Sequence, residues 1–140
     1  MAIKLITGLE SVNWHELAVV FERAPLGQRE PEILGQIFQN SSVRCFAYEN
    51  SAIIGAGRAL TDFINWTVIF DVVLLPEHQG FGHGRAIMQS LVEQSKARNV
   101  TLHSAPGKEG FYECLGYRRM KTAMALFANP ERAQEVKYIE

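Results

Sequence analysis

Cysteine is scarce in this sequence, with two residues among 140. Cys45 falls in a predicted strand and Cys114 in a predicted helix, and one pair so far apart forms neither a zinc-ligand pattern nor a disulfide framework. We therefore expect two reduced thiols and no metal site.

An excess of charge and long apolar runs are also missing. Lys and Arg total 14 and Asp and Glu total 15, giving a net charge of -1, which provides no general attraction to nucleic acid or to anionic membranes. No apolar run approaches the ~18 residues that cross a bilayer, and the first residues, MAIKLITGLES, lack the pattern of a signal peptide. We expect a cytoplasmic protein whose partners include neither nucleic acid nor membrane.

The residues that are present fit one globular domain over residues 1–140. The hydrophobic content of 47% and the charged content of 21% are ordinary for a soluble domain. Hydrophobic periodicity and turn residues predict the elements. In order, these are a strand at 2–7, a helix between Asn13 and Pro25, a helix from Pro31 to Asn40, strands at 43–48, 52–60 and 66–75, a helix over 85–98, a strand at 100–104, a helix at 108–115, and one bent strand or two short ones at 117–127. The fold class is α/β (α+β), a mixed, mostly antiparallel sheet flanked by helices in the order β-α-α-β-β-β-α-β-α-β.

The stretch from Trp66 to Arg98 organises the chain. Its strand is too apolar to leave one face in water, and three glycines at alternate positions (Gly80, Gly82, Gly84) then open an amphipathic helix. Glycines let backbone N–H groups turn toward a ligand, and the first turn of a helix carries unpaired donors and partial positive charge. We expect a phosphate site. It is neither a dinucleotide fingerprint, which needs glycine where Arg85 stands, nor a P-loop.

Two motifs extend this interpretation. Residues 79–84, QGFGHG, fit the pattern Q/R-x-x-G-x-G/A and, after VVLLPEH, resemble the acetyl-CoA signature of the GNAT superfamily of N-acetyltransferases. Residues 110–117, GFYECLGY, are similar to that family's later FYxxLGF segment. The resemblance implies acetyl-CoA as cosubstrate. It places the pyrophosphate on the loop formed by Gln79, Gly80, Phe81, Gly82, His83, Gly84 and Arg85.

The same resemblance implies roles for the strand before the loop and for the later motif. The pantetheine arm pairs with the backbone of Val72, Val73 and Leu74, and the Val72 N–H polarises the thioester carbonyl. Tyr112 matches the tyrosine that donates a proton to the departing CoA thiolate in many members. The chain departs from the family where an Asn is often found, since Ala105 and Pro106 stand there.

The general base has one principal candidate. Asp71 is a carboxylate within an apolar strand, and burying a carboxylate is costly, so it either has a partner or acts as the base, directly or through water. Glu30, Glu109 and His103 are weaker candidates.

The acceptor site should be walled by residues 21–38 and the last strands, where aromatic residues offer apolar surface. Ordinary core packing is the alternative for each of these aromatics, which are Phe21, Phe38, Phe63, Trp66 and Phe127. An aspartate just before VVLLP makes the chain similar to small bacterial and plastid enzymes related to serotonin acetyltransferases. We expect a small-molecule primary amine as the acceptor.

Two function classes follow from these patterns. The first is an acetyl-CoA-dependent N-acetyltransferase using direct attack in a ternary complex. The second is a noncatalytic acyl-CoA-binding sensor or interaction module, which the missing Asn and the uncertain base would suit. An exposed sheet edge or the last strands would allow a homodimer.

Overall fold

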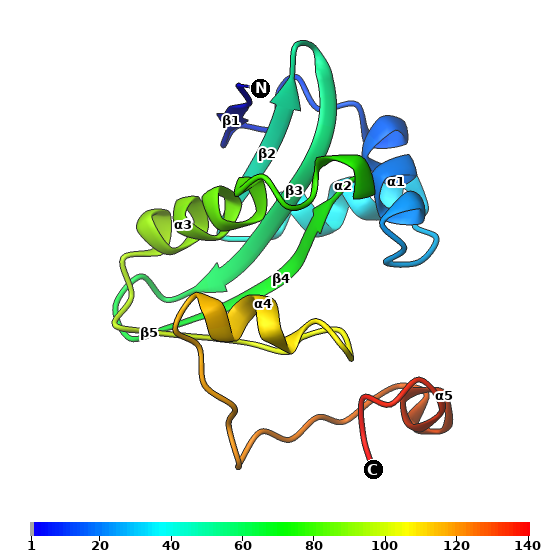
Figure 1. Ribbon diagram of the computed structural model, residues 1–140, viewed down its shortest axis with the longest axis vertical. Helices are drawn as coiled ribbons and strands as arrows, with labels where there is room; N and C mark the ends of the chain where they lie inside the picture. The colour runs from blue at the N-terminus through cyan, green and yellow to red at the C-terminus, as the bar shows by residue number, and fades with distance from the viewer. Residues whose placement is uncertain (1) are drawn as a thin grey trace. The chain divides into compact units, whose positions relative to one another are not determined.

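A computed structural model describes residues 2–140, which divide into two compact units, the first ending at Leu102 and the second beginning at His103. The first unit holds the whole sheet and three α-helices, and the second holds two short helices (Figure 1). The expectation of a single domain over residues 1–140 stays a prediction. The first unit contains β1 (Lys4–Ile6), α1 (Trp14–Arg23), α2 (Pro31–Gln39), β2 (Val43–Glu49), β3 (Ala52–Thr61), β4 (Trp66–Leu74), the 3-10 helix η1 (Pro76–His78), α3 (His83–Ser95) and β5 (Asn99–Leu102), and the second contains α4 (Glu109–Cys114) and α5 (Pro130–Glu135).

The sheet has five strands in the order β1-β2-β3-β4-β5. The first three pairings are antiparallel and β4 pairs with β5 in parallel. The parallel pair is joined through α3, because parallel neighbours need a crossover connection. These features confirm the predicted fold class.

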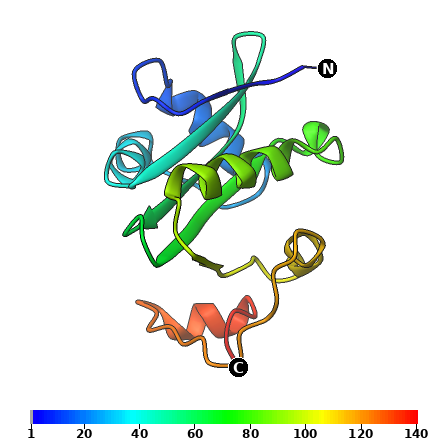
Figure 2. The same cartoon turned by 90° about the vertical axis from the view of Figure 1, so that its left-hand side faces the viewer.

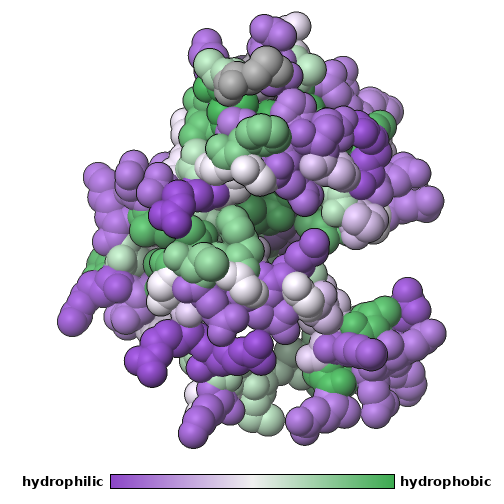
Figure 3. Space-filling view, viewed as in Figure 1, coloured by the Kyte–Doolittle hydropathy of each residue, from purple (hydrophilic) through white to green (hydrophobic). Residues whose placement is uncertain are grey.

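Helices cover both faces of the sheet (Figure 2). On one face, Trp14 of α1 and Phe38 of α2 pack against Phe46 of β2, with ring centroids 5.3 to 6.0 Å apart. On the other face α3 lies against β2, β3 and β4. In Figure 3, which shows the face that carries α3, hydrophilic side chains border the apolar ones around this helix.

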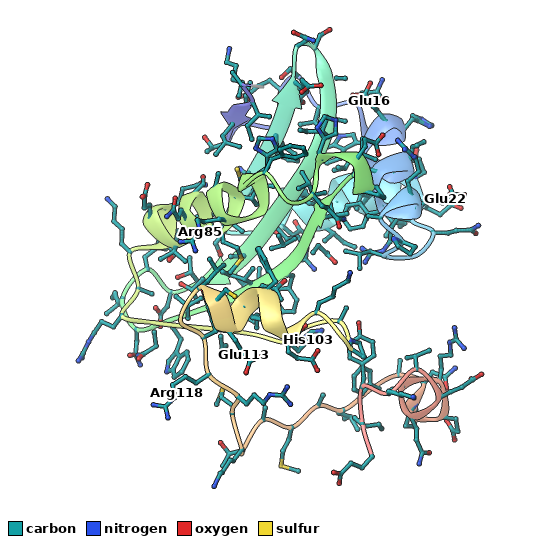
Figure 4. The ribbon with its side chains drawn as sticks, in the orientation of Figure 1. Glu16, Glu22, Arg85, His103, Glu113 and Arg118 are labelled. Carbon is teal, nitrogen blue, oxygen red and sulfur yellow. The ribbon has the colours of Figure 1, made fainter. Side chains whose placement is uncertain are left out.

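Polar contacts cap the N-terminus of α1 and also connect this helix to the sheet. The Asn13 side chain accepts a hydrogen bond from the Glu16 backbone N–H at 3.1 Å and so caps the helix. The Glu16 carboxylate in turn accepts from the Ile53 backbone N–H at 2.7 Å (Figure 4). A first-turn carboxylate therefore ties α1 to β3.

The last predicted strand is wrong. Residues 117–127 form no strand, and the described chain continues to α5, whose N-cap Asn129 accepts from the Arg132 N–H at 3.0 Å. A strand has no hydrogen bonds of its own and needs a neighbour, whereas Met124 and Leu126 are almost fully exposed. The strand-like composition of this segment finds no ladder partner among residues 2–140.

Candidate functional site

The glycine-rich loop leads from the sheet directly into α3. Gly82 is the N-cap of that helix with φ of 87° and ψ of 5°, and Gly80 also has φ of 87°. A Cβ added at either glycine would meet nothing within 4 Å. Glycine is therefore favoured here for its left-handed backbone conformation and not for space.

The first turn of α3 presents backbone donors beside this loop. No side chain caps the helix, so the N–H groups of the first turn keep their partial positive charge. The Phe81 and His83 rings stack with centroids 6.1 Å apart, and Arg85 extends from the same turn (Figure 4). Helix N-termini with unpaired N–H groups are places where anions bind, and the phosphate site at this loop stays a prediction.

Gln79 joins the loop to the end of β4. Its side-chain Nε2 donates to the Leu74 carbonyl oxygen at 3.0 Å. The side chain of this predicted cofactor-binding residue thus holds the loop in place, and its backbone is the part left to contact a ligand.

The second half of β4 has one free edge. Pairing with β5 ends at Ile69 opposite Leu102, although β4 itself continues to Leu74. On the β3 side the ladder is interrupted, because Asp71 and Val72 both stand opposite Gly57, which is the pattern of a β-bulge. Among the described residues, the stretch from Val72 to Leu74 has no strand paired with it on the β5 side, and this is the stretch predicted to bind pantetheine.

Asp71 sits within this bulge between two arginines. Its Oδ1 accepts from Arg29 Nη2 at 3.1 Å and its Oδ2 accepts from Arg58 Nε at 2.8 Å. Its φ of 56° is left-handed, which is uncommon for a residue other than glycine. Of the two alternatives for this carboxylate, the structure shows that it has partners.

These partners govern the protonation of Asp71. Burial alone would raise the pKa of the carboxyl, but the hydrogen bonds and charges of Arg29 and Arg58 outweigh burial and lower the pKa below its ordinary value. A carboxylate with both oxygens engaged and a lowered pKa is a weak proton acceptor.

Tyr112 belongs to α4 in the second unit. Burial, and secondly the charge of the neighbouring Tyr117, raise its pKa above the ordinary value. Its ring lies edge-on to Phe111 at 4.9 Å and to Tyr117 at 6.2 Å. The hydroxyl therefore stays protonated at neutral pH, as a general acid requires.

The weaker base candidates lie in different surroundings. Glu30 is an exposed residue that precedes α2 without a capping hydrogen bond. Glu109 accepts from the Gly107 N–H at 2.7 Å, and the His103 ring lies 6.0 Å from that of Tyr138.

A shallow hollow of about 380 Å³ opens beside the loop between α1 and α2. Its lining is partly acidic, and Arg29 belongs to it as well as to the Asp71 cluster. The lining residues are Ala18, Val19, Glu22, Gln28, Arg29 and Glu30.

Four of the five aromatics predicted for the acceptor site divide into two groups, and the fifth, Phe127, has its ring 6.1 Å from that of Tyr138. Phe21 and Phe38 are fully buried, so core packing was the right alternative for both. Phe63 and Trp66 are half-exposed at the turn between β3 and β4.

Sequence reasoning missed three arginines. Arg29 and Arg58 hold Asp71, and Arg23 Nη2 bonds both carboxylate oxygens of Glu77 at 2.9 and 2.8 Å, which links the end of α1 to η1. None stands in a motif, and each partner lies 13 or more residues away in the chain. Only the path of the backbone brings these pairs together.

Among residues 2–140, no group of three or more His, Cys, Asp or Glu side chains is placed to hold a metal ion. No helix in the same residues has the length and apolar character needed to cross a membrane.

Known proteins resemble this chain in sequence. A family model described as Acetyltransferase (GNAT) domain matches residues 16–125. Serotonin N-acetyltransferase 2, chloroplastic, of Oryza sativa subsp. japonica is 36% identical over 120 residues, which are 79% of this chain and 58% of that protein. The uncharacterized N-acetyltransferase ycf52 of Pyropia yezoensis is 27% identical over 115 residues, covering 77% of this chain and 66% of that protein. The chain thus spans less than two thirds of the length of these relatives.

Solved structures resemble it in fold. A structure from Deinococcus radiodurans R1 has a TM-score of 0.80 and 28% identity, covering 94% of this chain and 92% of that one. The acetyltransferase, GNAT family protein SP0256 of Streptococcus pneumoniae TIGR4 has a TM-score of 0.74 and 21% identity, covering 90% and 96%. The second likeness concerns the fold alone.

Proposed function

Because the chain belongs to the GNAT family of acetyltransferases, we propose that it transfers the acetyl group of acetyl-CoA to a primary amine by direct attack in a ternary complex. The observation that carries this proposal is the continuity of two binding features. The edge of β4 from Val72 to Leu74, which has no strand paired with it on the β5 side, leads into the glycine loop, and the Gln79 side chain joins the two by its bond to the Leu74 carbonyl. A long ligand with an extended arm and a phosphate end suits this path.

Acetyl-CoA, when bound, supplies the activated acyl group. In this proposal the backbone of Val72, Val73 and Leu74 pairs with its amide arm, and the Val72 N–H donates to the carbonyl oxygen as negative charge develops there. The N–H groups from Gln79 to Arg85 hold the pyrophosphate.

Tyr112 completes the proposed chemistry. As the neutral amine nitrogen bonds to the carbonyl carbon and the carbon–sulfur bond breaks, the Tyr112 hydroxyl gives its proton to the departing thiolate, and the proton that the amine loses passes to water, from which the Tyr112 oxygen recovers one. The raised pKa of this phenol keeps the proton available. We assign no base role to Asp71, because its two arginine partners lower its pKa and occupy both oxygens.

We propose a small-molecule amine as the acceptor. The hollow beside Arg29 carries the carboxylates of Glu22 and Glu30, and Figure 4 shows Glu22 projecting from α1. Carboxylates at a site entrance raise the local concentration of cationic amines. The name of the rice relative makes serotonin the first acceptor to test.

We also propose a homodimer. β1 is an edge strand of the sheet in the first unit, and Met124 and Leu126 are exposed apolar residues in the second. Free strand edges and apolar residues invite partners. Light scattering at working concentrations should give twice the mass of one chain, and a monomer mass would contradict the proposal.

The function is tested in two stages. Calorimetry should first detect binding of acetyl-CoA, with CoA lacking the acetyl group as a comparison. Release of CoA is then followed with a panel of serotonin, tryptamine, polyamines and amino acids, against a control without amine that measures hydrolysis. Failure of the wild type to bind acetyl-CoA would refute the proposal. Binding without amine-dependent release would favour the noncatalytic sensor instead.

A further inference from the structure

The bulge in β4 is the feature that shapes the proposed thioester site. Two residues, Asp71 and Val72, stand opposite Gly57, and the first of them has φ of 56°. A left-handed residue in a strand costs about 1–2 kcal/mol unless the surroundings hold it. Because Val72 follows this residue directly, the direction of its backbone N–H depends on the bulge.

One set of contacts that stabilises the bulge comes from the neighbouring strand, β3. Arg58 of β3 stands opposite Phe70, its guanidinium lies 4.8 Å from the centroid of the Phe70 ring, and its Nε donates to Asp71. Its Nη1 also donates to the Ser41 hydroxyl at 3.3 Å, and that hydroxyl donates to the Ile37 carbonyl in α2 at 2.8 Å. Arg58 is thus fixed at both ends, with 15% of its side chain exposed.

The other set of contacts that stabilises the bulge comes from the loop between α1 and α2. Arg29 lies with its guanidinium 4.6 Å from the centroid of the buried Phe21 ring and donates from Nη2 to Asp71. The same nitrogen lies 3.5 Å from the Leu26 carbonyl oxygen. Its side chain is 27% exposed and lines the hollow together with Glu22 and Glu30.

We propose that Arg29 and Arg58 are positioning residues that act through Asp71, holding the β4 bulge so that the Val72 edge meets the thioester arm of acetyl-CoA. Asp71 stays ionised as the common partner of both arginines and does not accept the proton of the amine. This inference rests on the proposed function, because it concerns the shape of the same binding edge. Under this proposal the loop between α1 and α2, which borders the hollow, also helps to position the β4 edge that binds acetyl-CoA, because it carries Arg29.

Three substitutions at Asp71 separate a positioning role from a base. Asp71→Gly and Asp71→Ala both remove the carboxylate, but only glycine takes the left-handed conformation freely. We expect acetyl-CoA to bind Asp71→Gly up to about tenfold more tightly than Asp71→Ala, because the competent bulge is less populated with alanine. Asp71→Asn, which tolerates left-handed φ and keeps an acceptor oxygen, should retain the most activity.

A general base would give a different pattern. Loss of a base typically costs about 10²- to 10⁴-fold in turnover. Under that alternative the Gly, Ala and Asn variants would all lose kcat to a similar extent, and the acidic limb of the pH profile would vanish in each. Equal losses in the three variants with loss of that limb would overturn the inference.

The arginines are tested directly with a matched control. Arg29→Gln and Arg58→Gln should each raise the acetyl-CoA dissociation constant by several-fold to about tenfold, and Arg58→Lys should recover part of the loss because it keeps the charge. Arg132→Gln breaks an exposed Arg–Glu pair in α5, with side chains 63% and 68% exposed, and should bind as the wild type does.

The outcomes distinguish this inference from the proposed function. If the wild type does not bind acetyl-CoA, the proposed function fails and the inference fails with it. If the wild type binds and the folded Arg29→Gln and Arg58→Gln variants bind equally well, only the inference is refuted. Thermal unfolding of each variant establishes that it is folded, and Arg29→Gln, at the more exposed of the two arginines, keeps the test valid should Arg58→Gln unfold.

Discussion

A charge placed at Gly82 should weaken acetyl-CoA binding through electrostatics alone. Gly82→Asp and Gly82→Asn form a matched pair, because both side chains have nearly the same size and both tolerate positive φ. Both also suit the N-cap of a helix. A Cβ at this position meets nothing within 4 Å, so neither variant is blocked by a clash. The pair therefore differs in one unit of charge at the start of α3.

The expected size of the effect follows from Coulomb's law. At a separation of about 5 Å and an effective dielectric constant of ~40, two unit charges repel by about 1.7 kcal/mol. A pyrophosphate carries about two charges, so Gly82→Asp should bind acetyl-CoA about 3 kcal/mol less tightly than Gly82→Asn, which is on the order of 10²-fold. The two variants should have similar thermal stability, because both carry the same backbone cost of positive φ. Both should also stay close to the wild type, because a capping hydrogen bond of about 1 kcal/mol offsets a backbone cost of similar size.

Titration calorimetry at several salt concentrations measures this difference. The gap between the two variants should shrink as salt rises, since exposed charges are screened over a Debye length of ~10 Å at 0.1 M. Equal dissociation constants for the folded Asp and Asn variants would show that phosphate does not approach Gly82. The reasoning about the loop would then be refuted.

Three further predictions concern catalysis, packing and pH. Tyr112→Phe keeps the ring and removes the proton donor, so kcat should fall by about 10²-fold with little change in acetyl-CoA affinity. The alkaline decline of activity, which the raised pKa puts above about pH 10, should vanish, and an unchanged kcat would make Tyr112 a packing residue. Gly57→Ala puts a Cβ 2.9 Å from Ile87 Cγ2 and should destabilise by about 1–3 kcal/mol in urea unfolding, whereas Gly110→Ala, with nothing within 4 Å, should not. Since the Asp71 pKa is lowered in the folded state, its ion pairs stabilise above the ordinary carboxyl pKa and are lost as pH falls through the lowered value. The stability gap between wild type and Asp71→Asn should therefore close in acid, and a gap independent of pH would contradict this linkage.

Local sequence signals predicted most elements, because the residues that begin, end and pattern those elements lie within or beside them in the sequence. Asn13 caps α1, Pro31 begins α2, and an apolar run closed by Pro76 makes β4. The glycine loop was also predictable, because Gly80 and Gly82 adopt a left-handed φ and glycine takes that conformation without a steric cost.

The segment at 117–127 shows where local signals fail. Its residues have the composition of a strand, but a strand forms only where another edge pairs with it. Composition states which residues tolerate a ladder and says nothing of whether a neighbour is present. The short helix that follows was foreseeable for the opposite reason, because Asn129 and Pro130 supply a cap and a first turn locally.

The cluster around Asp71 shows how much of the site could not be predicted from the sequence. A carboxylate in an apolar strand indicates that something unusual happens there, because an unpaired buried charge is costly. The chain has 14 Lys and Arg residues, and no spacing singles out the two that lie 13 and 42 positions from Asp71. Arg58 reaches it only because β3 pairs antiparallel with β4, and Arg29 only because the loop after α1 brings its side chain to Asp71. A base needs a free oxygen and a partner needs an occupied one, so the difference between these two roles lies in tertiary contacts that the order of residues does not contain.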